Sequence, residues 1–514
     1  MDLSPFSHNR EVLRISGPHS TMEQAAVMSL RLIPTDCPTQ AVTEGSTSRS
    51  PRPGPGLPSA AVLCCACLLL CALLPLVAQA QTVSTLANLK GTNGANPLFG
   101  TLLQGPDGNL YGTTSAGGAH GQGTVFKMTP TGKLATLYDF CSKSNCADGS
   151  APYAGLILAS DGNFYGTTQS GGASRNGTVF KITPKGALTT LHSFNSRDGA
   201  MPYAALLQAS DGNFYGTTES GGASLLGTIF KMTPSGTLTT LHSFSSTDGS
   251  SPEAPLTQAN DGNFYGTTYN GGTEGYGTVF KMTPAGTLTT LHVFGDPDGR
   301  AITAGLVQDA RGNFYGATTL GGVNGYGSVY SITPQGSMTI LHAFGATDGA
   351  SPNALALGTD GNFYGTTISG GANTDGILFE VTPLGAFNTL YTFNGSNGAD
   401  SFAALLQATD GNFYGTTRVG GSKNDGTIFR LDAGLSPFVA ALPNLAKAGA
   451  KIKILGNNLT GTTGVTFNGT PATFTVVSAS QIVTTVPASA TSGPIVVTTP
   501  TATLSSSTDF HVKQ

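Results

Sequence analysis

The chain has 514 residues, enough for two or three domains, and its formal net charge is −4. Only 10% of its residues are charged, and lysine and arginine do not cluster. This balance argues against nucleic acid and against anionic membrane surfaces as partners. Glycine is abundant, with 71 residues, against an average usage of about 7%. The turns of the repeats described below account for this excess.

The N-terminal 80 residues predict export. Residues 1 to about 57 are rich in Pro, Ser and Thr without periodicity, and we expect a disordered extension there. Ser59–Ala78 is almost wholly apolar and is followed by a small-x-small motif that ends at Ala80. This pattern predicts a signal peptide cleaved near Ala80, which leaves no stable membrane span in a secreted or cell-surface protein. An uncleaved membrane anchor is the alternative, since about 20 apolar residues span a bilayer.

From residue 81 to residue 434 a unit of about 50 residues recurs seven times. Its most regular part is Asp211–Thr218, with the sequence Asp-Gly-Asn-Phe-Tyr-Gly-Thr-Thr. The central tyrosines of the seven copies are Tyr111, Tyr165, Tyr215, Tyr265, Tyr315, Tyr364 and Tyr414. A constant period of this length is typical of propellers and solenoids.

Each unit predicts four short strands. In the third unit these are Tyr203–Ala209, Phe214–Thr218, Gly227–Met232 and Thr237–Phe244. Asp-Gly, Gly-Gly and Pro-x-Gly turns separate them, because glycine reaches positive φ and proline presets φ at the first turn position. Four strands in each of seven units predict an all-β fold, a seven-bladed β-propeller with four-stranded blades. A β-solenoid is the alternative.

The two ends of the repeat array complement each other. The seventh unit ends near Gly434 without its fourth strand, and a matching strand, Thr82–Leu89, lies at the start of the array. We therefore expect the last blade to be closed by the N-terminal strand, which removes free sheet edges. An open solenoid has no use for such a split unit, so the split favours a closed ring.

Residues 435–514 lose the period and show short strands with alternating apolar residues. These include Ala450–Leu455, Gly464–Gly469, Gln481–Pro487 and Ser492–Thr498. Short strands at this spacing, over a segment of this length, predict an immunoglobulin-like β-sandwich.

The motifs of the repeat carry a resemblance to a known family. DGNFYGTT, a Gly-Gly pair, GT[VI]FK[MI]TP and LTTLHSF resemble the Gloeo/Verruco repeat of exported bacterial proteins over residues 81–434. More loosely, the DGN-aromatic-x-GT motif is similar to blades of sensor-kinase propellers and of the virginiamycin B lyase type. Residues 435–514 resemble an IPT/TIG domain through Gly456, Asn468-Gly469, Val486-Pro487 and Ser492-Gly493. The resemblance implies a secreted or cell-surface location and no defined activity.

Several polar residues recur in register, and we expect them to have structural roles. His192, His242, His292 and His342 occupy one place in four units, and tyrosine takes that place in two others. Equivalent residues of different blades lie far apart unless they line the axis, so no metal site is expected. The Asp-Gly-Asn aspartates predict turns, because no neighbouring acids supply the roughly six to eight oxygens that calcium takes. No cofactor is expected.

Cys141 and Cys146 lie in an insertion of the first unit. In an exported protein two cysteines at this spacing predict a disulfide.

Specific binding or catalysis needs residues that break the repeat, because it happens at one place. Glu219 and Arg418 directly follow the Tyr-Gly-Thr-Thr strand in the third and seventh units, and His120 and Glu274 are further symmetry breakers. These four are the predicted binding residues. No catalytic residue is predicted, because no Ser-His-Asp order or close carboxylate pair is recognisable.

We expect a monomeric, non-catalytic binding or adhesion module for a glycan or a surface protein. Seven similar blades offer a multivalent face, and repeated weak contacts give avidity. Two alternatives stay open. One is a polysaccharide-active or lyase-type propeller enzyme, and the other is a structural spacer of the cell envelope.

Overall fold

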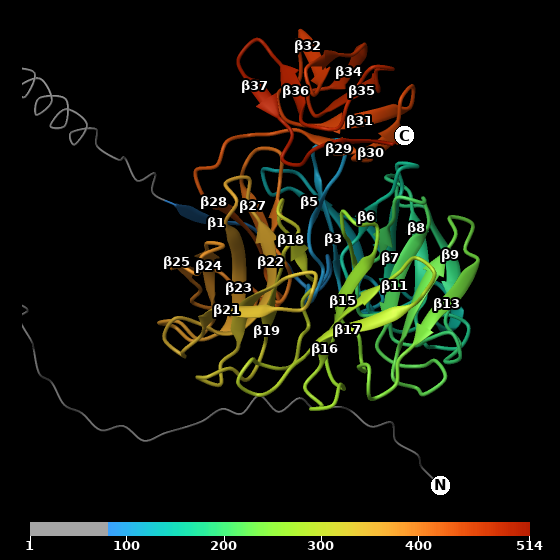
Figure 1. Cartoon of the computed structure of the whole chain (residues 1–514), viewed down its shortest axis with the longest axis vertical. Helices are drawn as coiled ribbons and strands as arrows, with labels where there is room; N and C mark the ends of the chain where they lie inside the picture. The colour runs from blue at the N-terminus through green and yellow to red at the C-terminus, as the bar shows by residue number, and fades with distance from the viewer. Residues whose placement is uncertain (1–80, 514) are drawn as a thin grey trace, which may run out of the picture. The chain divides into compact units, whose positions relative to one another are not determined.

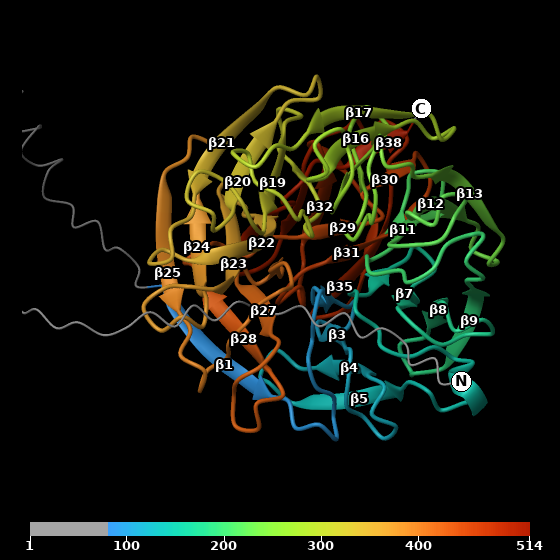
Figure 2. The same cartoon turned by 90° about the horizontal axis from the view of Figure 1, so that it is seen from below.

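The computed structural model describes residues 81–513, so the predicted extension and signal peptide at residues 1–80 lie outside the described residues. The regular structure of residues 81–513 is β, apart from one short 3-10 turn, η1 (Ser144–Cys146). Figure 1 shows the strands coloured along the chain, and in Figure 2 seven sheets surround a common centre.

Each of the seven repeats forms one four-stranded antiparallel sheet. In the third, the strands β10 (Leu207–Gln208), β11 (Phe214–Thr218), β12 (Thr228–Met232) and β13 (Leu238–Ser243) are neighbours in that order. The prediction of a seven-bladed propeller is confirmed. The first strand is shorter than the predicted Tyr203–Ala209, because only Leu207 and Gln208 pair with β11. Before them only Ala200 forms an isolated bridge, opposite Ser220, whereas the corresponding segment of the sixth blade pairs as a longer, bulged strand.

The other blades repeat this order. Their strands are β2 (Leu103–Gln104), β3 (Leu110–Thr114), β4 (Thr124–Met128) and β5 (Leu134–Asp139); β6 (Ile157–Leu158), β7 (Phe164–Thr168), β8 (Thr178–Ile182) and β9 (Leu188–Ser193); β14 (Thr257–Gln258), β15 (Phe264–Thr268), β16 (Thr278–Met282) and β17 (Leu288–Val293); β18 (Val307–Gln308), β19 (Phe314–Thr318), β20 (Ser328–Ile332) and β21 (Met338–Ala343); β22 (Ala350–Leu357), β23 (Phe363–Ser369), β24 (Ile377–Val381) and β25 (Phe387–Thr392); β26 (Leu406–Gln407), β27 (Phe413–Thr417) and β28 (Thr427–Asp432).

The fourth strand of the last blade comes from the N-terminal side of the array. β1 (Thr82–Asn88) pairs antiparallel with β28, from Thr82 opposite Asp432 to Asn88 opposite Thr427. Figure 2 shows the blue strand β1 beside the orange strand β28. The predicted closure is confirmed, and it gives β28 a partner on both sides.

The Asp-Gly-Asn turn is held by its own aspartate. In the third blade the Asp211 carboxylate accepts hydrogen bonds from the Asn213 backbone N–H at 3.0 Å and the Tyr215 hydroxyl at 3.0 Å. Lys231 Nζ lies 2.9 Å from the same carboxylate. In the fifth blade, where Arg311 replaces the acid, Asp309 accepts the tyrosine hydroxyl instead. Local hydrogen bonding therefore accounts for this repeated acid.

Aromatic side chains fill the space between neighbouring blades. The Tyr215 ring stacks on Phe264 of the next blade with centroids 4.2 Å apart, and Phe230 packs edge-on against Phe194 of the preceding blade. Gly216 lies under Phe230, where a Cβ atom would come within 2.6 Å of the ring. Burying a phenylalanine contributes about 1.5–3 kcal/mol, so these repeated contacts bind each blade to the next.

In four blades the recurring histidine joins the fourth strand to the loop that follows it. His242 Nε2 lies 3.0 Å from Asp248 Oδ2, and His192, His292 and His342 make the equivalent pair with the aspartate six residues further on. In the first blade the Tyr138 hydroxyl donates to Asp148 at 2.7 Å. At the end of the outermost strand, tyrosine and histidine therefore make the same hydrogen bond to the aspartate.

Residues 440–513 form the predicted immunoglobulin-like sandwich. One sheet contains β29 (Ala440–Leu442), β31 (Lys451–Leu455), β35 (Gln481–Thr485) and β34 (Phe474–Ser478), and the other contains β33 (Thr470–Pro471), β32 (Gly464–Phe467), β36 (Ile495–Thr498) and β37 (Thr503–Ser505). β30 (Leu445–Lys447) pairs in parallel with β38 (His511–Lys513). Ile454, Phe467 and Phe510 belong to the core between the sheets.

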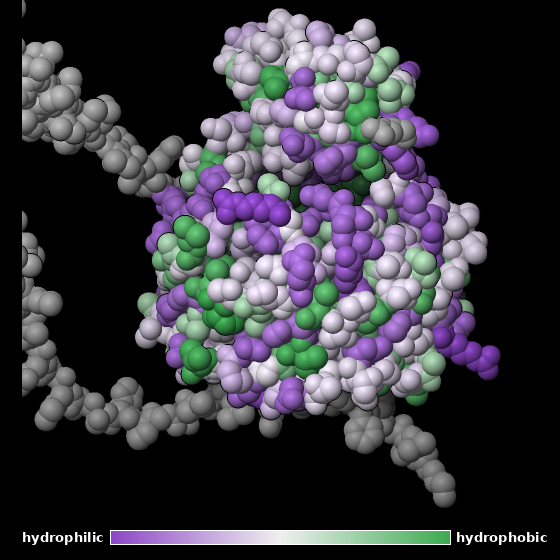
Figure 3. All heavy atoms as spheres, in the orientation of Figure 1, coloured by the Kyte–Doolittle hydropathy of each residue, from purple (hydrophilic) through white to green (hydrophobic). Residues whose placement is uncertain are grey.

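No helix within residues 81–513 has the length and apolar character needed to cross a bilayer. On the face seen in Figure 3, apolar residues are scattered among hydrophilic ones.

Candidate functional site: the axial ring

A cavity of about 70 Å³ lies at the centre of the propeller. Six of the seven blades contribute residues to its wall, which places it on the axis of the ring. Small residues such as Ala204, Ala304 and Ala354 form part of its wall, and larger side chains form the rest.

The larger side chains form what we call the inner ring. It has one residue per blade, from the segment before the first strand or, for Asn353, from β22 itself, and its members are Phe99, Tyr153, Tyr203, Glu253, Thr303, Asn353 and Phe402. All of them except Tyr153 line the cavity.

One side of the inner ring is aromatic. Phe99 contacts Phe402 with ring centroids 5.7 Å apart, and it also reaches Tyr203, two blades away, at 6.5 Å. Tyr153 lies edge-on to Tyr203 at 5.1 Å. These edge-to-face contacts are the arrangement that aromatic pairs prefer.

The other side of the inner ring is polar. Thr303 Oγ1 donates to Asn353 Oδ1 at 3.0 Å, and Asn353 Nδ2 donates to the backbone carbonyl of Phe402. Glu253 lines the cavity with a residue exposure of only 6%. The cavity wall therefore combines a buried acidic residue with aromatic side chains.

A second set of seven residues, the outer ring, surrounds the first. Each member directly follows the Tyr-Gly-Thr-Thr or Tyr-Gly-Ala-Thr sequence of its blade, and the members are Ser115, Gln169, Glu219, Tyr269, Thr319, Ile368 and Arg418. Gln169 Nε2 donates to the Tyr203 hydroxyl at 3.2 Å, and the Thr319 and Thr303 hydroxyls are 3.2 Å apart. The two rings are therefore in contact.

Arg418 is the only lysine or arginine among the fourteen residues of the two rings. Its guanidinium lies 5.5 Å from the centroid of the Phe402 ring, and its Nη2 is 2.5 Å from Asp400 Oδ2. Asp400 balances the positive charge, and the Phe402 ring already accepts a cation on its face.

Residues with a left-handed backbone conformation hold the backbone of the outer ring through hydrogen bonds. In every blade a residue other than glycine has a φ near +55°, and these residues are Asn96, Ala151, Met201, Ser251, Ala301, Ser351 and Asp400. The carbonyl of Met201 accepts the Glu219 backbone N–H at 3.0 Å, and that of Asp400 accepts the Arg418 N–H at 2.9 Å. Such a conformation costs about 1–3 kcal/mol per residue, so the surrounding structure holds this rim firmly.

The carboxylates influence the neighbouring tyrosines. Burial, together with the negative charge of Glu219, raises the pKa of Tyr153. Burial also raises the pKa of Tyr203, and Glu219 and Glu253 both add to that effect. Both tyrosines therefore keep their protons at neutral pH.

The blades differ from one another in the two rings, as they also do in the exposed loops after the Gly-Gly pairs. Seven different residues occupy the outer ring, although the strand before it reads Tyr-Gly-Thr-Thr in six blades and Tyr-Gly-Ala-Thr in the fifth. A residue that only holds a blade together has the same surroundings in every blade, because rotation relates them. The variation therefore gives the axis a set of side chains that no single blade repeats.

The structure separates the four predicted binding residues into two groups. Glu219 and Arg418 belong to the outer ring. His120 and Glu274 are exposed on the Gly-Gly loops of the first and fourth blades, on different sides of the ring. The inner ring was not predicted. The signal that reveals it is the variation at one place, five residues after the Asp or Asn of the Asp-Gly or Asn-Gly pair that follows the fourth strand in most units.

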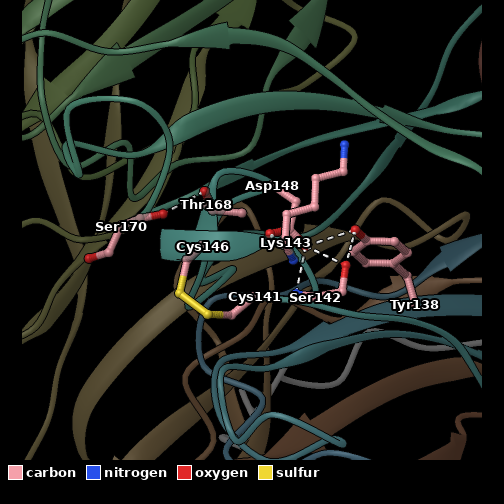
Figure 4. Close-up of a disulfide and its surroundings, with 8 residues drawn as sticks. All are labelled: Tyr138, Cys141, Ser142, Lys143, Cys146, Asp148, Thr168 and Ser170. Atoms are coloured by element: carbon pink, nitrogen blue, oxygen red, sulfur yellow. Dashed lines mark hydrogen bonds between the residues drawn. A yellow bond between two sulfur atoms is a disulfide. The ribbon is translucent and has the colours of Figure 1, made fainter.

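Cys141 and Cys146 are joined by a disulfide in the loop after β5. Figure 4 shows Tyr138, Ser142 and Asp148 beside it. The Asp148 carboxylate accepts hydrogen bonds from the Tyr138 hydroxyl and the Ser142 hydroxyl and N–H, at 2.7–2.9 Å. The disulfide therefore closes the insertion over the same kind of pair that histidine makes elsewhere.

The fold defines the class of this protein: a repeat propeller, with residues of unlike chemistry around its axis, followed by an immunoglobulin-like domain. The model of the Gloeobacter/Verrucomicrobia repeat matches residues 73–261 and 256–475, and that of the IPT/TIG domain matches residues 440–512. The chain belongs to the Gloeobacter/Verrucomicrobia repeat family.

Solved structures share the architecture at low identity. A fungal alcohol oxidase of the AA5 family, in complex with copper, has a TM-score of 0.50 at 16% identity, over 84% of this chain and 99% of that chain. Virginiamycin B lyase from Staphylococcus aureus has a TM-score of 0.48 at 15% identity, over 68% and 98%. These likenesses concern the fold alone. No curated protein matches the chain.

Proposed function

We propose that this protein is an exported, monomeric, non-catalytic binding module, secreted or held at the cell surface, whose ligand is a glycan bound at the axial ring. One observation carries the proposal: the blades differ from one another at the positions that surround the axial cavity. Aromatic side chains beside a few fixed polar groups are typical of ligand sites.

This proposal replaces the sequence-based hypothesis, in which seven similar blades form a multivalent binding face, with a single binding site. The two rings offer one asymmetric site, whereas equal binding by every blade would use positions that are alike in every blade. We therefore place the ligand on the axis.

The alternative of a lyase-type enzyme rests on His120, Glu219 and Glu274 acting together. His120 and Glu274 belong to loops of different blades, away from the ring that holds Glu219. The geometry favours binding over catalysis by this set.

A glycan array with the full chain tests the proposal. We expect saturable binding to one class of sugar, which Glu219→Ala weakens by about tenfold or more, equivalent to about 1.4 kcal/mol. Glu274→Ala tests the exposed loop in parallel. Dependence on Glu274 and not on Glu219 would place the ligand at the loop tips. Turnover of a polysaccharide panel would support the enzyme, and no response in either assay would favour the envelope spacer.

Export is tested separately, by expressing the chain with its residues 1–80 in a bacterial host. We expect the mature protein outside the cytoplasm to begin at Gln81. An intact N-terminus in the membrane fraction would favour the uncleaved anchor.

A further inference from the structure

The axial cavity is too small for a sugar ring. An engineered protein cavity of about 150 Å³ binds one benzene molecule, so the axial cavity of about 70 Å³ has room for one small group of a ligand. The rest of that ligand must lie on the rim, against the half-buried aromatic side chains. The chemistry of the cavity wall thus decides which group enters.

The wall combines aromatic faces with a carboxylate. Glu253 is almost fully buried in the wall, and Phe99, Tyr203 and Phe402 line the same cavity. The negative charge of Glu219, in the outer ring, contributes to the raised pKa values of Tyr153 and Tyr203. Aromatic faces and carboxylates both attract organic cations, with about 0.5–2 kcal/mol from an aromatic face alone.

Cations are bound in this way elsewhere in the molecule, as Lys231 is over Tyr215 and beside Asp211, and one such cation belongs to the two rings. Arg418 places its guanidinium over Phe402 and pairs with Asp400, on the seventh-blade side of the ring. In blades two to six the charged ring residues are Glu219 and Glu253, and neither ring has a lysine or arginine there. Tyr153, Tyr203 and Glu219 of the second and third blades offer the same two groups that hold the Arg418 guanidinium, an aromatic ring and a carboxylate.

We propose that the axial site selects an amino sugar with a free, protonated amine, whose ammonium group enters the cavity beside Glu253 while the sugar rings lie on the aromatic rim. This proposal rests on the proposed function and specifies its ligand. A cationic peptide is the competing ligand. A stable interface of two proteins usually buries about 1,200–2,000 Å², and a cavity for one small group does not call for such a surface.

The test uses two probes with the same backbone: a β-1,4-linked glucosamine hexamer and its fully N-acetylated form. Acetylation removes the positive charge and enlarges the group that must enter the cavity. At about pH 6, where amines are largely protonated, we expect the full chain to bind the glucosamine hexamer at least about tenfold more tightly.

Glu219→Gln removes a half-buried carboxylate without changing its size, and we expect it to abolish most of this preference. Glu253→Gln is the second variant, checked for an unchanged thermal midpoint because the residue is buried. Asp509→Asn, which removes one charge from an exposed residue of the C-terminal domain, is the matched control.

The outcomes separate the ligand class from the proposed function. Equal or tighter binding of the acetylated hexamer, still weakened by Glu219→Gln, would overturn the amino-sugar proposal and leave axial glycan binding in place. Binding of a lysine-rich peptide that depends on Glu219, without glycan binding, would overturn both. Binding unaffected by either ring variant would also overturn both.

Discussion

At the scale of single residues, His242 shows that the repeat tolerates exchange where only one hydrogen bond must be kept. Its ring bonds Asp248 at 3.0 Å, and Tyr138 makes the corresponding bond to Asp148 in the first blade. Both partners in the third blade are largely buried. The side-chain type therefore matters less here than the donor.

We predict that His242→Tyr keeps the thermal midpoint of the protein within about 1–2 °C, whereas His242→Ala lowers it. The alanine variant leaves the largely buried Asp248 carboxylate without this donor, which costs about 1–3 kcal/mol. Differential scanning calorimetry of both variants measures the effect. Equal destabilisation by both would show that the imidazole itself is required.

Asp211 leads to a prediction about pH. Burial alone would raise the pKa of Asp211, but the hydrogen bonds from Lys231, Asn213 and Tyr215 outweigh it and bring the pKa to about 2. Because this value lies below the ordinary 3.8, the carboxylate stabilises the fold above about pH 4 and loses that effect as the pH falls through about 2.

Asp211→Asn should therefore lower the thermal midpoint at neutral pH, and the difference from the wild type should shrink between about pH 4 and about pH 2. Asp509→Asn, at an exposed residue, serves as the control. A difference that stays constant across this range would mean that the charge of Asp211 does not contribute.

At the scale of elements, β1 is the strand on which closure of the ring depends. It covers the edge of β28, and its Val83 packs against the core between the sixth and seventh blades. Without β1 the edge of β28 presents unpaired backbone groups that can pair with another chain.

We predict that deleting residues 82–88 lowers the thermal midpoint by more than about 5 °C and produces oligomers. Light scattering after size-exclusion chromatography measures the oligomers. A synthetic peptide of residues 82–90 added in trans should restore the monomer, because a free strand can add to an open sheet edge. A monomeric deletion variant with an unchanged midpoint would contradict the role given to β1.

At the scale of the whole molecule, the asymmetric rings predict one bound ligand per chain. Seven equivalent blade sites would instead bind up to seven. Isothermal titration calorimetry with a short oligosaccharide found on the array measures the stoichiometry. A value near seven would locate binding on the repeated surfaces and contradict the axial site.

The architecture could be predicted from the sequence because the repeat carries it many times. Tyr215 and its six counterparts set the period, and the missing last strand, found again at Thr82–Asn88, gave the closure. Glu219 and Arg418 were found because they follow a regular strand. The inner ring was missed because Phe99, Glu253 and Phe402 are far apart in the chain and chemically unlike, so that only the folded ring brings them together.

The contacts of Phe99 restrict the number of repeat units that the propeller can have. Near-identical tandem repeats readily gain or lose a copy during recombination, and a propeller of six or eight blades would change the width of the axis. Phe99 meets Phe402 of the neighbouring blade and Tyr203 two blades away at the same time. A wider or narrower ring would separate or crowd these side chains. The aromatic contacts on the axis therefore favour a ring of seven blades over a ring of six or eight.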